Sequence, residues 1–334
     1  MPGAPSPSLE HLRAEVDARL EAFLDERSKA LVEAGDLIGA IRGVIEAGGK
    51  RLRPAFCYWG YRAAGGDHAP QIVSVAAALE LLHTFAIVHD DIMDAALERR
   101  GRPSVLAQHG METALLVGDL ALVLADDLFM SSGFSPNVIA RGFGCYSRMR
   151  QEVIAGQYLD LKAGADVDEA TVRRIAVLKS GRYSVEEPLA IGATLAGAET
   201  AFLERLAAFA APLGEAFQLR DDLLGTFGAA TTTGKPIDSD IRQGKRNIVF
   251  ARTLAALTGA ERAWFVSRWG APDLTAEEVE RLRSLAGSTS RPSIEALLEE
   301  LDARAATALA SLGCEPEAGA ALDELRALAI VRDS

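Results

Sequence analysis

The chain has 334 residues, of which 49% are hydrophobic and 25% are charged. This balance is typical of a soluble globular protein with a sizeable core, and it excludes a disordered, collagenous or coiled-coil chain. With 35 Lys and Arg against 47 Asp and Glu, the net charge is -12, so no nucleic-acid partner is expected, because phosphate contacts need concentrated positive charge. An anionic ligand must be held by a few local cations or by metal ions.

The first predicted element is a flexible tail, residues 1–8, rich in Pro and Ser. It lacks the apolar core of a signal peptide. The three cysteines are far apart and form no CxxC pair, which fits a reducing cytoplasm. Polar or charged residues interrupt the longest apolar stretches before they reach about 20 residues, so no membrane span is predicted.

From Leu9 onward the dominant period is helical, and no run of alternating β-branched residues appears. Gly and Pro mark most junctions. No linker divides the chain, so the sequence predicts one all-α domain, a helical bundle, over residues 9–334. After the first helix, the predicted helices span 36–47, 54–64, 70–94, 111–131, 136–163, 168–180, 184–197, 199–226, 240–257, 259–269, 275–286, 292–312 and 317–332.

The motif DDIMD places Asp90, Asp91 and Asp94 at the end of a very apolar helix. Residues four apart share a helix face, so Asp90 and Asp94 project together. The negative end of the helix dipole adds to their repulsion, so a cation should compensate. Mg²⁺ suits this place, since it takes one or two carboxylates together with substrate phosphates. Alone, the motif fits a solvated acidic helix end equally well.

A second cluster, Asp221 and Asp222 in FQLRDDLLGTFG, lies on another apolar helix. Aspartate pairs within two hydrophobic helices are hard to explain as solvated surface. We expect the two clusters to face each other across the bundle core and to form a site for several metal ions and a diphosphate.

Basic residues accompany the first cluster along the chain. The Arg guanidinium can donate two parallel hydrogen bonds to two oxygens of a phosphate, whereas the Lys ammonium acts as a point charge. Any one of these cations alone would be interpreted as surface, but together with two acidic clusters they favour an anion site. They come from GGKRLRP, from the apolar helix and from ERRGRP, and comprise Lys50, Arg51, Arg53, His83, Arg99 and Arg100.

These segments together resemble the trans-isoprenyl diphosphate (polyprenyl) synthases, most of all geranylgeranyl diphosphate synthases. The resemblance runs in order through GGKRLRP, LLHTFAIVHDD, DDIMD, RRGRP, GQYLDL, KSGRYSVEEPLAIGA, FQLRDD and GKPIDSDIRQGKR. It implies the all-α isoprenoid synthase fold, a homodimer, and condensation of isopentenyl diphosphate with an allylic diphosphate, assisted by several Mg²⁺ ions.

The resemblance also implies roles for individual residues. Asp90, Asp94 and Asp221 would coordinate Mg²⁺, supported by Asp91 and Asp222. The residues implied to bind the isopentenyl diphosphate are Lys50, Arg53, His83 and Arg100. Those implied around the allylic substrate are Arg99, Lys179, Ser180, Gln218, Lys235 and Lys245, with Lys179 and Lys235 counted as catalytic.

One departure concerns the second motif, which usually reads DDxxD. Gly225 stands in the final acidic place, and Asp222, Asp238 or Asp240 is a candidate to compensate. Ser180 stands where Thr is commoner, which keeps the hydroxyl. The departure leaves open how one metal ion is coordinated, but it does not change the reaction class that the resemblance implies.

The implied chemistry explains these residue types. Metal ions and cations stabilise the departing diphosphate, so the allylic carbon–oxygen bond ionises to a carbocation. The double bond of isopentenyl diphosphate attacks that cation, and loss of a proton, for which the released diphosphate is the candidate base, completes the product. Water must be excluded because it would quench the cation, and an alanine-rich helix bundle provides an apolar environment.

Product length is implied by the residues just before the first motif. In the resembling family, a single aromatic at the fifth position before it goes with a twenty-carbon product, and aromatics at the fourth and fifth positions go with fifteen. Phe85 and the small Ala86 occupy these places, so geranylgeranyl diphosphate is expected. The alternative is that Phe85 simply packs in the core.

Other functions stay open at this point. A farnesyl or longer-chain synthase would share every motif. A terpene cyclase would carry an Asn/Ser/Glu metal triad in place of the second aspartate pair and would lack GGKRxRP. A non-catalytic synthase subunit should have lost one aspartate motif, whereas both pairs are present. A purely structural helical protein leaves the paired aspartates unexplained.

Overall fold

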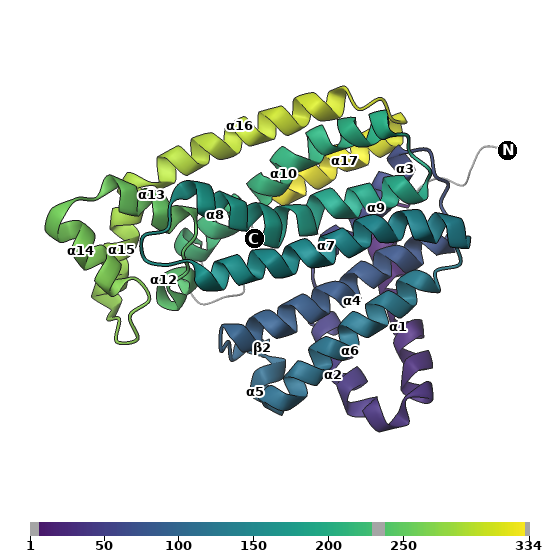
Figure 1. Cartoon of the computed structure of the whole chain (residues 1–334), viewed down its shortest axis with the longest axis horizontal. Coiled ribbons are helices and arrows are strands. Elements are labelled where there is room, and N and C mark those ends of the chain that lie inside the picture. The colour runs from purple at the N-terminus through teal and green to yellow at the C-terminus, as the bar shows by residue number, and fades with distance from the viewer. Residues whose placement is uncertain (1–6, 229–237, 331–334) are drawn as a thin grey trace. The chain divides into compact units, whose positions relative to one another are not determined.

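The computed structural model describes residues 7–228 and 238–330, and within them the chain is almost entirely helical (Figure 1). This confirms the predicted all-α fold. The chain forms two compact units. Unit 1 comprises Met1–Tyr146, Glu187–Leu206 and Leu312–Leu325, and unit 2 comprises Ser147–Glu186, Ala207–Ser311 and Arg326–Ser334. That residues 9–334 form a single domain stays a prediction.

The elements follow one another in chain order as mostly long helices with one short strand pair. They are α1 (Leu9–Ala30), η1 (Val32–Ala34), α2 (Gly35–Glu46), α3 (Leu52–Ala63), α4 (Pro70–Met93), β1 (Glu98–Arg99), β2 (Arg102–Pro103), α5 (Val105–His109), α6 (Met111–Met130), α7 (Pro136–Lys162), α8 (Glu169–Ala176), the π-helix η2 (Val177–Glu186), α9 (Glu187–Leu195), α10 (Thr200–Phe227), α12 (Ser239–Gln243), α13 (Ile248–Ala256), α14 (Gly259–Arg268), α15 (Ala276–Thr289), α16 (Arg291–Ala310) and α17 (Pro316–Ile330).

Most predicted helix ends lie close to the observed ones, but two predictions were wrong. The break expected between 168–180 and 184–197 is absent, because η2 joins α8 to α9 as a continuous π-turn segment, a feature frequent at functional sites. The helix expected over 240–257 is two helices. Gly244, with φ +68°, ends α12, and the Asn247 side chain caps α13 by accepting a hydrogen bond from Phe250 N at 3.2 Å.

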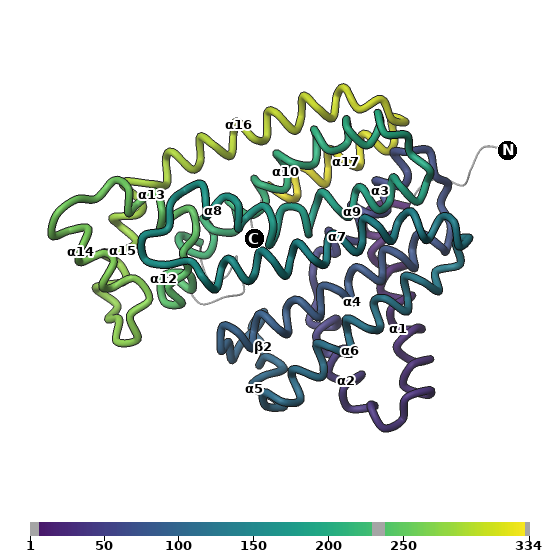
Figure 2. Tube along the Cα trace, in the orientation of Figure 1, coloured from purple at the N-terminus to yellow at the C-terminus, as the bar shows by residue number. Residues whose placement is uncertain are grey.

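Unit 1 is built around α4. Helices α1, α2, α3 and α6 all pack against it, and α4 and α6 run side by side in Figures 1 and 2. Within the described residues, α4 alone is long and apolar enough to cross a membrane by length and composition, but 72% of its most apolar window is buried. Such burial is typical of a core helix, so the aspartates at its end are carried by a helix packed into the core of the unit.

Unit 2 has its own core, formed around α13, α14 and α15. Phe250 stacks on Phe265 with ring centroids 5.4 Å apart, and Trp269 packs against both rings. Trp269 Nε1 donates a hydrogen bond to the carbonyl oxygen of Lys245 at 3.0 Å. The aromatic core therefore fixes the backbone that follows α12, where one predicted site residue lies.

Candidate active site

The segment GGKRLRP forms a turn that leads into α3. Gly48 and Gly49 have φ of +87° and +151°, values that glycine adopts without steric cost. Arg51 is buried, and its guanidinium donates to Asp17 Oδ1 at 2.7 Å, to Glu80 Oε1 at 2.7 Å and to Ile45 O at 2.8 Å. Arg51 therefore anchors the turn. Glu80, a carboxylate within the very apolar helix α4, was the sequence signal for this buried pair.

The segment ERRGRP forms a hairpin in which Arg99 pairs with Arg102. Its two turn residues, Arg100 and Gly101, have φ of +54° and +71°, the left-handed conformation that a type I′ hairpin turn requires of both central residues. At the tip, Arg100 Nη1 donates a hydrogen bond to the carbonyl oxygen of Gly48. This contact joins the hairpin to the GGKRLRP turn.

Arg99 connects the hairpin to the first aspartate cluster. Its Nε donates to Asp91 Oδ1 at 2.8 Å, and its Nη2 contacts both Asp91 and Asp90, the latter at 3.3 Å. The side chain of Asp91 is 3% exposed and that of Asp90 is 23% exposed. The chain itself thus supplies part of the positive charge that the repelling carboxylates require. Arg99, which was predicted to lie near the allylic substrate, binds these aspartates in the structure.

His83 lies among guanidinium groups. Burial lowers the pKa of His83 well below its usual value, and the positive charges of Arg53, Arg100, Arg99 and Arg51 lower it further. The lowered pKa favours the neutral imidazole of His83 at pH 7. Three of the residues predicted to bind one diphosphate, Arg53, His83 and Arg100, come together in unit 1, while the fourth, Lys50, is exposed.

The two product-length residues also lie in unit 1. Phe85 is buried, and its ring packs edge-on against His89 with centroids 4.8 Å apart. His89 lies over Gly118 of α6, where an added Cβ would approach its Cδ2 to 2.2 Å. Ala86 is partly exposed. Sequence reasoning missed His89, although its position four residues after Phe85 was a signal.

The second aspartate cluster belongs to unit 2, on α10. Asp222 is buried and accepts hydrogen bonds from Gln218 Nε2 at 2.7 Å and from Ile248 N at 3.4 Å. Burial, together with the negative charge of Asp240, raises the pKa of Asp222 to about 7. Gln218, predicted to contact substrate, thus holds an aspartate. Asp221 is partly exposed beside it.

Unit 2 also carries most of the remaining predicted residues. Lys179 Nζ lies 2.6 Å from Asp160 Oδ2, and Ser180 is buried; both belong to η2. Lys245 Nζ lies 3.9 Å from Asp240 Oδ1. Lys235 lies outside the described residues. Because the two aspartate clusters belong to different units, their facing each other stays a prediction.

The carboxylates fit Mg²⁺ by their chemistry. Among residues 7–228 and 238–330, no three or more His, Cys, Asp or Glu side chains form a group that would hold a metal ion unaided. Mg²⁺ does not require such a cage, because it keeps waters and binds through one or two carboxylates plus substrate phosphates. Asp90 and Asp94 at the end of α4, and Asp221 on α10, offer that kind of incomplete site.

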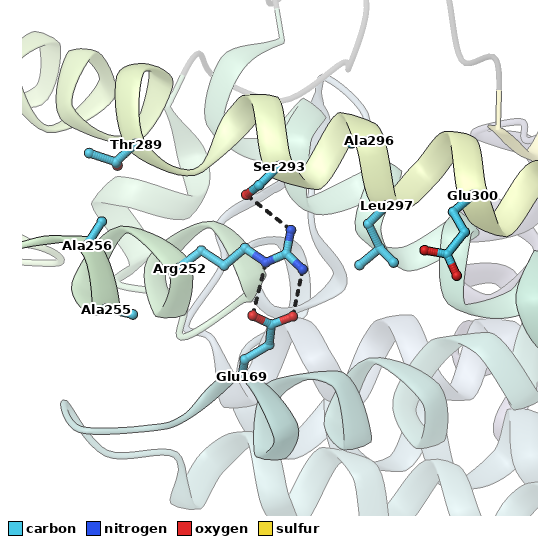
Figure 3. Close-up of a pocket in the computed structure, with 9 residues that line it drawn as sticks. All are labelled: Glu169, Arg252, Ala255, Ala256, Thr289, Ser293, Ala296, Leu297 and Glu300. Carbon is cyan, nitrogen blue, oxygen red and sulfur yellow. Dashed lines mark hydrogen bonds and ion pairs between the residues drawn. The ribbon is translucent and has the colours of Figure 1, made fainter.

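A cavity of about 630 Å³ in unit 2 lies elsewhere (Figure 3). There the Arg252 guanidinium is held by Glu169, at 3.0 and 2.7 Å, and by Ser293 at 3.2 Å. None of the predicted site residues that the structure describes lines this cavity. The Arg252 cation of this cavity is already paired with Glu169, so the charged clusters are better candidates for an anion site than this cavity.

Comparison with known proteins agrees with the motif order. Residues 36–285 match the family model described as polyprenyl synthetase. Geranylfarnesyl diphosphate synthase of Aeropyrum pernix is 34% identical over 255 residues, 75% of this chain and 79% of the relative. (2E,6E)-Farnesyl diphosphate synthase of Mycobacterium bovis is 36% identical over 241 residues, 71% of this chain and 66% of the relative.

Solved structures give the same result for the fold. The structure of geranylgeranyl pyrophosphate synthase from Corynebacterium glutamicum, complexed with isoprenyl diphosphate and magnesium, is similar with a TM-score of 0.93 and 30% identity. The similarity covers 98% of this chain and 100% of that one. The named products of these relatives differ in length, so the comparisons fix the family and the fold, but no single product.

Proposed function

The chain belongs to the polyprenyl synthetase family, and on that premise we propose that it condenses isopentenyl diphosphate with an allylic diphosphate to give mainly geranylgeranyl diphosphate. The observation that carries the proposal is the junction made by Arg99 and Arg100 in unit 1. Arg99 holds Asp90 and Asp91, while Arg100 holds the GGKRLRP turn. The first aspartate cluster, proposed to bind the diphosphate that leaves, and the cationic GGKRLRP turn, proposed to bind the diphosphate that stays, are therefore neighbours within unit 1.

Two diphosphates with different fates need two different surroundings. Isopentenyl diphosphate must not ionise, so it is assigned to Lys50, Arg53, His83 and Arg100, which bind charge without a carboxylate-held metal. Neutral His83 adds a hydrogen bond there. The allylic diphosphate must leave, so it is assigned to the aspartates, and bound Mg²⁺ would neutralise the charge that develops on it.

The chain's own groups complete the reaction environment. Asp90, Asp94 and Asp221 would hold the metal with support from Asp91 and Asp222, and the allylic diphosphate would be bound by Lys179, Ser180, Gln218, Lys235 and Lys245. After the carbon–oxygen bond of the allylic substrate breaks, the double bond of isopentenyl diphosphate attacks the resulting cation and forms the new carbon–carbon bond. The released diphosphate accepts the proton, and the apolar core around α4 excludes water from the cation.

Product analysis tests the proposal directly. The full chain is incubated with labelled isopentenyl diphosphate, Mg²⁺ and dimethylallyl, geranyl or farnesyl diphosphate in turn, and the dephosphorylated products are separated by chain length. We expect twenty-carbon product from at least one starter, and none after chelation of Mg²⁺. Absence of elongation with every starter overturns the proposal.

Phe85 and Ala86 make the product length testable. The growing apolar tail is proposed to run back along α4 from the aspartates, so that Phe85 closes its path. Phe85→Ala should lengthen the product, and Ala86→Phe should shorten it toward farnesyl diphosphate. Phe202→Ala, which removes an aromatic ring on α10, is the matched control and should not change the length. An unchanged distribution in both α4 variants contradicts the assignment.

We also propose that the active form is a homodimer that pairs through α6. Leu116, Val123 and Met130 recur every seven residues on this helix and are 54%, 61% and 54% exposed, an apolar stripe typical of a helix that meets a partner. Leu116→Lys with Val123→Lys should halve the mass measured by light scattering. Val32→Lys, at a 73% exposed residue outside α6, is the control.

A further inference from the structure

The Arg51 guanidinium is held by the protein on three sides. Its side chain is 4% exposed, and each of its three nitrogens donates a hydrogen bond. Nε binds Asp17 of α1 at 2.7 Å, Nη1 binds Glu80 of α4 at 2.7 Å, and Nη2 binds the carbonyl oxygen of Ile45 at 2.8 Å. Arg51 therefore contributes to a diphosphate site through the turn that it holds, and not as a ligand of the diphosphate.

The backbone of Arg51 is strained. Its φ is +49°, in the left-handed region that residues with a side chain rarely adopt, and such a conformation persists only where the surrounding structure holds it. Arg51 is also the N-cap residue of α3. Lys50 directly precedes it, and Arg53 lies in the first turn of that helix. The contacts that hold Arg51 therefore determine where these two neighbouring cations lie.

We propose that Asp17 and Glu80 are positioning residues for the isopentenyl diphosphate site, and that they act by holding Arg51. This inference rests on the proposed function. Neither carboxylate is assigned to the substrate itself. The proposed function assigns that diphosphate to a cationic group that comprises Lys50, Arg53, His83 and Arg100.

Glu80 offsets the repulsion between cations at this place. The guanidinium groups of Arg51 and Arg100 lie on either side of Gly49, where an added Cβ would be 3.4 Å from Arg51 Nη1 and 3.2 Å from Arg100 Nη1. Burial lowers the pKa of Arg100, and the neighbouring guanidinium groups lower it further, whereas the negative charge of Glu80 raises it. Since Glu80 is itself only 5% exposed, its carboxylate stabilises both cations from within the core.

Asp17 connects the first helix to the same turn. It belongs to α1, which lies before the residues 36–285 that match the family model, and α1 packs against both α3 and α4. The Asp17 side chain is 38% exposed, so its ion pair with Arg51 contributes little stability by itself. The value of this contact lies in fixing the direction of a guanidinium that is otherwise buried.

Substitutions at Arg51 and Asp17 test the inference. Arg51→Gly removes the guanidinium, while glycine adopts the left-handed conformation without strain. Asp17→Asn removes the charge and keeps the shape, and Asp17→Glu keeps the carboxylate. Asp25→Asn is the matched control, because Asp25 also lies on α1 but binds Arg42 of α2, at 2.8 Å.

Two measurements on the full chain separate the two diphosphate sites. Calorimetric binding of inorganic pyrophosphate in the presence of a chelator reports on the cationic group, because the aspartate clusters need Mg²⁺ to hold a diphosphate. Steady-state kinetics, with each substrate varied in turn, then gives the KM for isopentenyl diphosphate, the allylic KM and kcat. A general loss of structure would change all of these quantities together.

We expect Arg51→Gly to weaken pyrophosphate binding and to raise the KM for isopentenyl diphosphate by about tenfold or more, the size expected when a charged hydrogen bond is lost. The allylic KM and kcat should change far less. Asp17→Asn should have an effect of about threefold, because an exposed ion pair contributes less. Asp17→Glu should recover most of that loss, and Asp25→Asn should match the wild type.

The failures of the two proposals are distinguishable. If the wild type binds pyrophosphate without metal but elongates no allylic diphosphate, the proposed function is wrong. The positioning role is wrong if the wild type does not bind pyrophosphate without metal, or if Arg51→Gly and Asp17→Asn keep the wild-type affinity.

Equal increases in the KM of both substrates, or an equal loss of affinity in Asp25→Asn, also overturn the positioning role, since the effect would then not be local to the turn. If circular dichroism shows that Arg51→Gly does not fold, the comparison of Asp17→Asn with Asp17→Glu decides. Equal pyrophosphate affinity of these two variants contradicts the inference.

Discussion

In the first aspartate cluster the buried carboxylate is held by a guanidinium, whereas in the second it is held by amide groups. Arg99 contacts Asp91 and Asp90 in unit 1, while Gln218 and the backbone of Ile248 contact Asp222 in unit 2. A fixed positive charge keeps a carboxyl group ionised, and neutral donors compensate burial only in part.

This difference predicts different electrostatic behaviour in the two units. The pKa of Asp222 is raised to about 7, chiefly by burial and then by Asp240, so its ionised form is disfavoured without a bound cation. In the first cluster, by contrast, the Arg99 guanidinium pairs directly with Asp91. The first cluster is thus preformed by the chain, and the second gains most from an added cation such as Mg²⁺.

The largest effect is expected from the metal-facing carboxylates. Asp90→Ala or Asp94→Ala should lower turnover by about 10³-fold or more, because stabilisation of the leaving diphosphate is lost. Circular dichroism should show an unchanged fold, and Asp36→Ala, at an exposed aspartate of α2, should leave turnover unchanged. Near-normal turnover of either variant at saturating Mg²⁺ contradicts the assignment of the first cluster.

Removal of the guanidinium tests whether the first cluster depends on the chain itself. Arg99→Gln leaves Asp91 buried without its ion pair, and breaking such a pair typically costs about 3 kcal/mol or more. Chemical unfolding should show this loss without any added metal. Arg102→Gln, its exposed hairpin partner, should be nearly neutral. Equal unfolding free energies of the two variants would show that the Arg99 ion pair does not stabilise the first cluster, and the proposed difference between the two clusters would be wrong.

Arg53→Ala tests whether the cationic residues of unit 1 bind a different diphosphate from the one assigned to the aspartate clusters. It should raise the KM for isopentenyl diphosphate about tenfold or more, as expected when a charged hydrogen bond to phosphate is lost, and change the allylic KM far less. Steady-state kinetics with each substrate varied in turn measures this, with Arg13→Ala as the exposed control. Equal effects on both substrates would show that the division into two diphosphate sites is wrong.

The smallest effect concerns pH. Because the folded pKa of Asp222 is raised, its contribution favours the folded state below the unfolded pKa near 3.8 and is lost as pH rises through about 7. Between pH 5 and 8, without metal, wild-type stability should fall relative to Asp222→Asn, by at most about 1.4 kcal/mol per pH unit for one proton. Asp273→Asn, 75% exposed, is the control. A difference that does not change with pH contradicts this.

Sequence alone determined the helical class and predicted the chemistry of the site. Helical spacing and Gly or Pro junctions depend on local backbone preferences, which is why most helix ends were predicted. The aspartate pairs were evident because carboxylates within apolar helices are costly and so point to function. The resemblance then supplied the family, which the comparison with known proteins confirmed.

Tertiary structure decided which charges neutralise one another. Arg51, for example, is bound by Asp17 and Glu80, which lie 34 and 29 residues away along the chain. The carboxyl group of Asp240 beside Gly225, and the place of His89 over Gly118, are equally invisible in the chain order. Each depends on distances between helices far apart in sequence, and local periodicity carries no information about such distances.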